Sequence, residues 1–285
     1  MKIGFIDYYL DEWHANNLPT WIREETKGDI TVAYAYGKID SPVEGGKTNA
    51  EWAEKQGVEL LDSIEDVVEK SDALVVLAPN FPELHEELCD LALRSGKPTY
   101  VDKTFAPDAE SAARMIRKAM EHNTPMFSSS ALRFAPEVQP IDRSQIRMIS
   151  MRGPGPYGMY SIHQIEPIVS LMGAEPEQVM FIGAPDQPGL VIRFSGNRWA
   201  TAQHFDWECP FNLSVNYADG KASAYVTECT EFFPHFVTEL VDFFRTGSVK
   251  APYDQTLAVM AIRSAGFEAM KTPGEWVKIP PLPQI

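Results

Sequence analysis

Residues 72–106 read DALVVLAPNFPELHEELCDLALRSGKPTYVDKTFA, and this stretch decides the fold. It begins with the apolar run Ala73–Leu77, which is typical of a strand buried on both faces of a parallel sheet. A helical segment over Pro82–Ser95 stops at Gly96, and a second strand follows over Thr99–Val101. Strand, helix and strand in this order predict a right-handed βαβ unit.

The same alternation of strand and helix signals continues on both sides of this unit. We expect further strands over Ile3–Asp7, over Ile30–Tyr36 and from Met126, and further helices over Pro19–Thr26, Asn49–Gln56, Ser63–Lys70 and Asp108–His122. Repeated βα units of this kind indicate a parallel, doubly wound sheet. The sequence therefore predicts an α/β Rossmann-like domain over residues 1–128.

The pattern changes in residues 129–285, where strand signals follow one another directly. We expect strands over Ile146–Arg152, Gln178–Ile182, Leu190–Phe194, Trp199–Phe205, Phe211–Tyr217 and Ala222–Thr227, and helices over Tyr160–Met172, Pro234–Arg245 and Tyr253–Met270. Asp219-Gly220 is a strong hairpin signal between the last two strands. This half is predicted to be an α+β domain with a mainly antiparallel open sheet.

Composition limits the kind of partner. The chain has 285 residues and a net charge of −15, which repels nucleic acid and anionic membranes and favours a small-molecule substrate. No apolar run approaches the roughly 18 residues of a membrane helix. The three cysteines include no C-x-x-C pair, and the first residues lack the pattern of a signal peptide. We therefore expect a cytoplasmic protein with free thiols.

A family resemblance rests on the residues around the central βαβ unit. Ala78-Pro79-Asn80 follow the buried strand, His85 comes five residues later, Gly96-Lys97 end the helix, and Asp102-Lys103-Thr104 follow the next strand. This pattern resembles the Gfo/Idh/MocA family of sugar and cyclitol dehydrogenases, which has Glu-Lys-Pro at the last position. The run Phe236–Pro252 also looks like the ending of that family. The resemblance implies an NAD(P)-dependent oxidoreductase acting on a sugar-like or other small polyhydroxy substrate.

Lys103 is the first candidate catalytic residue. It follows a strand, so it lies at the carboxyl edge of the parallel sheet, where such folds bind ligands. An ammonium group there can hydrogen-bond a substrate oxygen and stabilise negative charge that develops on it. The resemblance implies that Lys103 lies beside the nicotinamide.

His163 is the second candidate, in the segment GMYSIHQIEPIVSLMG at residues 158–173. The segment is similar to the family motif D-x-G-x-H-x-x-D, which implies that His163 accepts the hydroxyl proton. Imidazole suits that role because it exchanges protons near neutral pH. Glu166 matches the later acid of the motif and lies one helical turn from His163. The first acid of the motif is replaced by Met159, so the relay that it would orient is missing.

The resemblance also implies NAD or NADP as cofactor. The candidate cofactor-binding residues are Asp7, Tyr8, Tyr9, Ala78, Pro79, Asn80, His85, Asp102, Lys103 and Arg133, the last in a motif similar to the family's Arg-x-x-Pro.

The glycine-rich turn of dinucleotide folds is nevertheless absent, because Asp7, Tyr9 and Glu12 stand at its three glycine positions. The sequence thus also allows weak dinucleotide binding, an altered pose or no dinucleotide.

Two other interpretations remain open at this point. The chain could be a degenerate family member that binds a small ligand without turnover, or an enzyme for elimination or epimerisation without net redox change. No metal is expected, because His204, Asp206, Glu208 and Cys209 lack a recognised ligand spacing. A homo-oligomer is expected by analogy with the family only.

Overall fold

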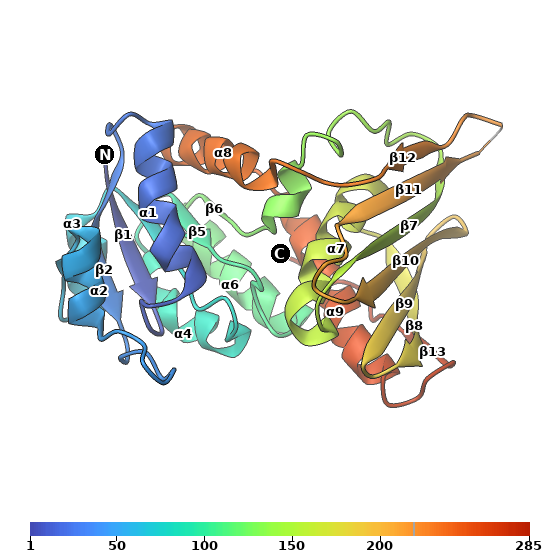
Figure 1. Ribbon diagram of the computed structural model, residues 1–285, viewed down its shortest axis with the longest axis horizontal. Coiled ribbons are helices and arrows are strands. Elements are labelled where there is room, and N and C mark those ends of the chain that lie inside the picture. The colour runs from blue at the N-terminus through green and yellow to red at the C-terminus, as the bar shows by residue number, and fades with distance from the viewer. Residues whose placement is uncertain (219) are drawn as a thin grey trace.

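The N-terminal part of the chain forms a parallel sheet with helices on both faces (Figure 1). The computed structural model describes residues 1–218 and 220–285. Six strands lie in the order β3-β2-β1-β4-β5-β6, which is the order of a Rossmann fold. Their bounds are β1 Lys2–Asp7, β2 Thr31–Gly37, β3 Glu59–Leu60, β4 Ala73–Val76, β5 Thr99–Val101 and β6 Met126–Phe127. The predicted α/β fold class is confirmed.

Helices α2 (Asn49–Gln56), α3 (Ile64–Lys70) and α6 (Ala109–Glu121) begin within one residue of their predicted starts, whereas α1 (Trp13–Glu25) begins earlier. Thr48 and Glu51 form a reciprocal capping box on α2, and Asp108 caps α6. These local hydrogen bonds satisfy backbone N–H groups that have no partner inside the helix.

Two predicted helices differ from the structure. Helix α1 begins at Trp13, six residues before the predicted start at Pro19, because the Glu12 side chain accepts hydrogen bonds from the first free N–H groups. The segment predicted as one helix over Pro82–Ser95 is divided into the short turns η1 (Pro82–Leu84), α4 (His85–Leu88) and α5 (Asp90–Leu93). The earlier start of α1 matters for the site, because it places His14 in the first turn of that helix.

The C-terminal part contains a seven-stranded sheet in the order β12-β11-β7-β10-β9-β8-β13. Its strands are β7 (Ile146–Pro154), β8 (Pro176–Ala184), β9 (Gln187–Phe194), β10 (Arg198–Phe205), β11 (Asn212–Tyr217), β12 (Ala224–Val226) and β13 (Trp276–Lys278). The sheet is mainly antiparallel, as predicted, although β7 and β10 pair in parallel. Strands β11 and β12 pair as predicted, with Ser214 opposite Tyr225, while Asp219 of the expected turn lies outside the described residues.

Three long helices accompany this sheet, α7 (Tyr157–Met172), α8 (Phe232–Thr246) and α9 (Tyr253–Ala269). Helices α7 and α9 pack closely, since a Cβ atom on Gly266 would lie 1.8 Å from the Tyr157 hydroxyl oxygen. That hydroxyl donates to the carbonyl of Arg263 at 3.0 Å. The contact holds α7, which carries His163, against the last helix of the chain.

Helix α8 leaves the C-terminal sheet and lies beside α1 on the N-terminal part (Figure 1). Its buried face, including Phe236, Leu240 and Phe243, shares one hydrophobic cluster with Phe5 and Phe127. A second cluster joins the other face of the parallel sheet to α7, α9 and the C-terminal sheet. The two parts are therefore packed together on both faces of the parallel sheet. Helix α8 follows the predicted boundary at residues 128 and 129 in sequence, yet it packs on the N-terminal part.

The structure also describes the three cysteines and the helices that could be compared with a membrane span. Cys89, Cys209 and Cys229 are free thiols, as expected. Among the described residues, no helix has the length and apolar character needed to cross a membrane.

Candidate functional site

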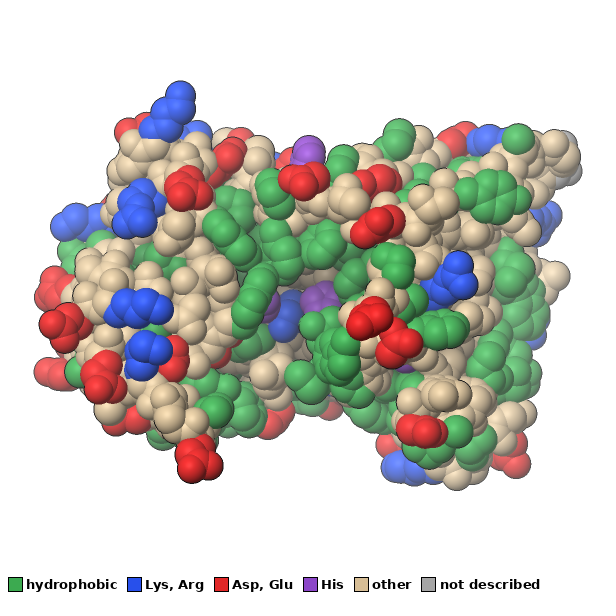
Figure 2. Space-filling model, in the orientation of Figure 1, with side chains coloured by type: hydrophobic (Ala, Val, Ile, Leu, Met, Phe, Trp, Pro, Cys, Tyr) green, Lys and Arg blue, Asp and Glu red, His purple; other side chains and the backbone are tan. Residues whose placement is uncertain are grey.

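A cavity of about 120 Å³ lies where the two parts of the chain meet. Its polar wall includes Lys103 and His14 from the N-terminal part and His163 from the C-terminal part. Figure 2 shows histidine and basic side chains inside a hollow at the middle of the molecule, surrounded by apolar side chains. The two candidate catalytic residues, Lys103 and His163, are 60 positions apart in sequence and line the same cavity.

Lys103 stands on the loop that follows β5, at the carboxyl edge of the parallel sheet. Its side chain is partly buried. In residues 1–218 and 220–285, its ammonium group forms neither an ion pair nor a hydrogen bond with a protein acceptor. An ammonium held at a cavity wall in this way is available to an oxygen atom of a ligand.

Asp102 precedes Lys103, and both of its carboxylate oxygens have partners in the protein. One carboxylate oxygen is paired with Nδ1 of His14, and the other accepts a hydrogen bond from the Tyr100 hydroxyl at 3.1 Å. Burial by itself would raise the pKa of Asp102, but the charge and hydrogen bond of His14 outweigh it and hold that pKa below its usual range. Asp102 therefore remains a carboxylate that orients His14.

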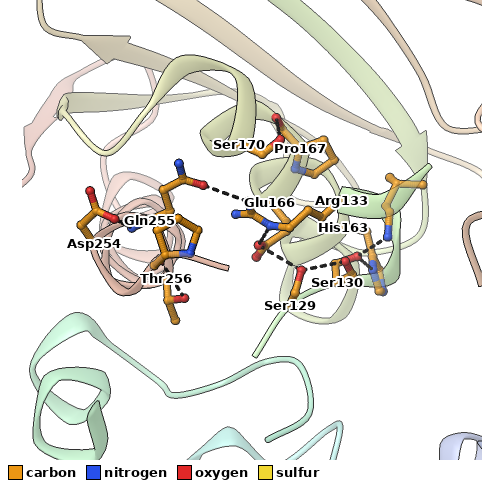
Figure 3. A network of polar contacts seen from close by, with 12 residues as sticks. Ser129, Ser130, Arg133, His163, Glu166, Pro167, Ser170, Asp254, Gln255 and Thr256 are labelled. Carbon is orange, nitrogen blue, oxygen red and sulfur yellow. Dashed lines mark hydrogen bonds and ion pairs between the residues drawn. The ribbon is translucent and has the colours of Figure 1, made fainter. Parts of the chain in front are cut away.

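His163 reaches the cavity from α7. Its Nδ1 lies 2.7 Å from the Ser130 hydroxyl oxygen (Figure 3), and its Nε2 has no hydrogen-bond partner among residues 1–218 and 220–285. Burial, followed by the nearby positive charges of Lys103 and His14, lowers the pKa of His163 well below its ordinary value. The imidazole is therefore neutral at physiological pH, which is the form that can accept a proton.

Glu166 lies outside the cavity, although it follows His163 by one helical turn. Its carboxylate is buried and pairs with Nε of Arg133 at 2.6 Å, and it accepts a hydrogen bond from Ser129 at 3.2 Å (Figure 3). Arg133 also donates to Gln255 at 2.8 Å. Both candidate site residues, Glu166 and Arg133, thus form a buried ion pair behind the cavity wall and do not line it.

The N-terminus of α1 is closed by the protein itself. The Glu12 carboxylate accepts hydrogen bonds from the backbone N–H of His14 at 2.8 Å and from that of Ala15. Asp11 does not cap the helix, since its carboxylate accepts from the backbone N–H of Lys47 and the side chain of Asn16. In most dinucleotide folds these helical N–H groups face the pyrophosphate.

Asp7 adds a second acid at this end of β1. It is buried, and one oxygen accepts from the backbone N–H of Tyr8 at 2.7 Å, while the other has no partner in the described part of the chain. Burial and the nearby carboxylate of Glu12 raise the pKa of Asp7 well above its ordinary value. An additional anion would meet the Glu12 carboxylate beside the buried and less readily ionised Asp7.

Aromatic rings pack between the loops after β1 and β4. Tyr8 and Tyr9 lie against Phe81, with ring centres 5.1 Å and 6.3 Å apart. Ala78 is buried with a φ of 79°, whereas Pro79 is partly exposed and Asn80 is exposed. Tyr8 and Tyr9 thus lie in the loop where the family has glycine. In the segment after β4, Pro79 and Asn80 are at least partly exposed to solvent, whereas Ala78 is not.

His85, another candidate cofactor ligand, is a structural residue. Its ring nitrogens lie 2.9 Å from the carbonyl oxygen of Phe105 and 2.6 Å from that of Leu77. The side chain is fully buried, so it joins the end of β4 to the loop after β5 and does not face the cavity.

The sequence analysis missed His14 and the aromatic wall of the cavity. The aromatic side chains of the wall are Trp21, Tyr100, Tyr160, Phe211, Phe232, Phe233 and Phe236. His14 was missed because α1 was predicted to begin at Pro19; an acid at Glu12 two residues before a histidine, directly after the first strand, is the signal that would have found it. The aromatic residues come from five separate segments, and only their packing brings them together.

Comparison with known proteins agrees with this fold. Residues 32–129 match the Gfo/Idh/MocA model, described as an oxidoreductase family with an NAD-binding Rossmann fold. None of the curated protein sequences compared with the chain matches it.

Solved structures match over almost the whole length. They include scyllo-inositol dehydrogenase of Lactobacillus casei (18% identity, 98% of both chains, TM-score 0.77) and myo-inositol dehydrogenase of Corynebacterium glutamicum (15% identity, 99% of both chains, TM-score 0.76). GenD2 from gentamicin A biosynthesis, solved with NAD, matches at 13% identity over 98% of this chain and 96% of its own (TM-score 0.77).

The solved structures share a two-part architecture with a Rossmann fold. Residues 32–129 match the model of the Gfo/Idh/MocA oxidoreductase family, in agreement with the resemblance noted in the sequence. The residues at the first turn depart from that family, however. With Glu12 on the helical N–H groups, Asp7 buried beside it and Tyr9 in place of a glycine, they do not fit a pyrophosphate in the usual Rossmann position.

Within the described part of the chain, no three His, Cys, Asp or Glu side chains gather as a metal site would require. His204, the one histidine of the sequence cluster around residue 206, has its Nδ1 2.9 Å from the carbonyl oxygen of Gly155.

Proposed function

We propose that this chain is an enzyme that acts on a small polyhydroxy or sugar-like compound, with Lys103 and His163 as its catalytic residues. The observation that supports this is their position on the wall of one cavity, although they belong to different halves of the chain. A cytoplasmic location and a homo-oligomeric assembly belong to the same proposal, from the cysteine usage and from analogy with the family.

Lys103 would bind the oxygen at which the reaction occurs. Its ammonium group has no protein acceptor among the described residues, so it can donate to a hydroxyl, carbonyl or alkoxide oxygen. The positive charge stabilises an oxygen that becomes more negative in the transition state.

His163 would exchange a proton with the same substrate. A neutral imidazole accepts a hydroxyl proton through Nε2, provided that Nδ1–H donates to Ser130. The resulting imidazolium lies near Lys103 and His14, whose charges disfavour it, so the proton is returned readily. Ser130 fixes the orientation of the ring in both protonation states.

Two reactions are compatible with these roles. The match of residues 32–129 to an oxidoreductase family favours a dehydrogenase, for which NAD or NADP would supply the redox chemistry. The carboxylate of Glu12 on the α1 N-terminus favours the second candidate, epimerisation or elimination by proton transfer without a dinucleotide.

One experiment separates the two candidates. The purified protein is incubated with a panel of sugars and inositols, once with NAD(P) and once without it in D₂O. Formation of NAD(P)H supports the dehydrogenase, and incorporation of deuterium at carbon without a cofactor supports proton transfer alone. Both activities should be lost in His163→Gln and Lys103→Met and retained in the exposed variant His235→Gln. Activity that survives in H163Q and K103M would contradict the proposal.

A further inference from the structure

Some polar groups in and around the cavity have hydrogen-bond or ion-pair partners among the described residues, and others have none. Asp102 is held by His14 and Tyr100, and the buried Glu166 of α7 is paired with Arg133 behind the wall. Lys103 has no such partner in the described part of the chain. The cavity therefore presents a positive charge to its contents and offers no unpaired carboxylate in return.

The rest of the wall supplies few hydrogen-bond acceptors. Trp21, Phe211, Phe232, Phe233 and Phe236 line it with aromatic surface, and they are joined by the rings of Tyr100 and Tyr160. Each substrate hydroxyl group that this wall leaves without a partner is costly, so a charged contact with Lys103 would have to outweigh that cost. A flat ring face, in contrast, packs well against aromatic side chains.

The size of the cavity agrees with a single ring. Its volume of about 120 Å³ is slightly below the roughly 150 Å³ of an apolar cavity that takes up one benzene molecule. A larger molecule, such as a disaccharide, would have to extend past the rim.

We propose that the cavity binds a small monocarboxylate built on a six-membered ring, with the carboxylate on the ammonium of Lys103 and one ring face on the aromatic wall. The inference rests on the proposed function and narrows its substrate class from polyhydroxy compounds in general to ring acids. His163 then faces a ring hydroxyl group, since it lines the same small space from the opposite half of the chain. The ammonium of Lys103 has three N–H donors, so it can bind the carboxylate and still donate to the oxygen of that hydroxyl group, at which the proposed reaction occurs.

The test uses two matched pairs of probes, D-glucuronate with D-glucose and benzoate with benzamide. Each pair keeps the ring and changes the charge. Binding is measured by calorimetry and by the fluorescence of tryptophan, which Trp21 reports from the wall itself. We expect at least one carboxylate to bind about tenfold or more tightly than its neutral counterpart, because a charged hydrogen bond is gained.

Variants assign the effect to Lys103. K103M should reduce the affinity of the carboxylate to that of its neutral counterpart, K103R should retain the preference, and the exposed variant Lys55→Met should bind like the wild type. Because Lys103 has no partner within the described protein, K103M should keep the melting temperature of the wild type.

The inference is overturned if neither carboxylate binds more tightly than its neutral counterpart, or if K103M keeps the preference. The proposed function fails separately, because it depends on turnover. A wild type that converts a neutral polyol through Lys103 and His163 but prefers no carboxylate would leave the function standing and end this inference. Conversely, carboxylate binding that persists in H163Q, together with turnover that H163Q does not affect, would support the inference and contradict the function.

Discussion

The imidazole of His14 and the carboxylate of Asp102 form an ion pair that joins the first turn of α1 to the end of β5. Both side chains line the cavity, and Tyr100 donates a further hydrogen bond to the same carboxylate. The pair fixes the loop from which Lys103 extends. Its effect on stability can be measured because Asp102 is buried and ionised.

Asp102→Asn should lower the free energy of unfolding by about 3 kcal/mol at pH 7, since it removes one partner of a buried ion pair. The folded-state pKa of Asp102 lies below its unfolded value, so this stabilisation is present above about pH 4 and is lost as the pH falls further. Urea unfolding of the wild type and D102N at several pH values checks this, with the exposed Asp62→Asn as control. A difference that stays constant down to pH 2.5 would contradict it.

His163 should remain neutral across the physiological range. Because burial and the charges of Lys103 and His14 lower its pKa, its ring signals in nitrogen NMR should not titrate between about pH 6 and pH 8, where an ordinary histidine loses its charge near pH 6.5. K103M removes one of those charges and should raise the pKa of His163, while K55M should leave it unchanged. Titration of His163 near pH 6.5 in the wild type would show that the cavity does not perturb it.

The ion pair between Arg133 and Glu166 should act on stability. Arg133→Met leaves a buried carboxylate without its partner and should cost about 3 kcal/mol, which corresponds to a melting temperature lower by roughly 5 °C in a chain of this size. The double variant R133M/E166L should recover part of the loss, because no unpaired charge remains. If R133M instead abolished turnover at unchanged melting temperature, the pair would have a catalytic role.

Dinucleotide affinity should be weak in the wild type. Glu12 occupies the helical N–H groups, and Asp7 and Tyr9 replace glycines, so a pyrophosphate would meet negative charge and bulk at the first turn. We expect no submicromolar binding of NAD or NADP in calorimetry. The double replacement of Asp7 and Tyr9 by Gly, or Glu12→Gln alone, should raise the affinity about tenfold for each close repulsion removed. Submicromolar binding by the wild type would show that the loop moves aside.

The sequence determined the fold because the fold depends on local signals. The apolar strand at residues 73–77, the caps at Thr48, Ser63 and Asp108, and the glycines that end helices act over a few neighbouring residues, and all are visible in the chain. The position of Lys103 follows from the same logic, since a residue after a parallel strand must lie at the edge where ligands bind.

Only the tertiary structure decided which of the candidate residues meet. His163 and Glu166 are one turn apart on α7. His163 lines the cavity, whereas Glu166 pairs with Arg133 behind it, because the two side chains contact different neighbours of the helix. Helix α8 packs against the N-terminal part, and this packing places Phe233 and Phe236 in the cavity wall. Side chains from residues 14–21 and 100–103 line the same wall. Such contacts join segments more than a hundred residues apart, and their energy depends on shape and burial that no local pattern encodes.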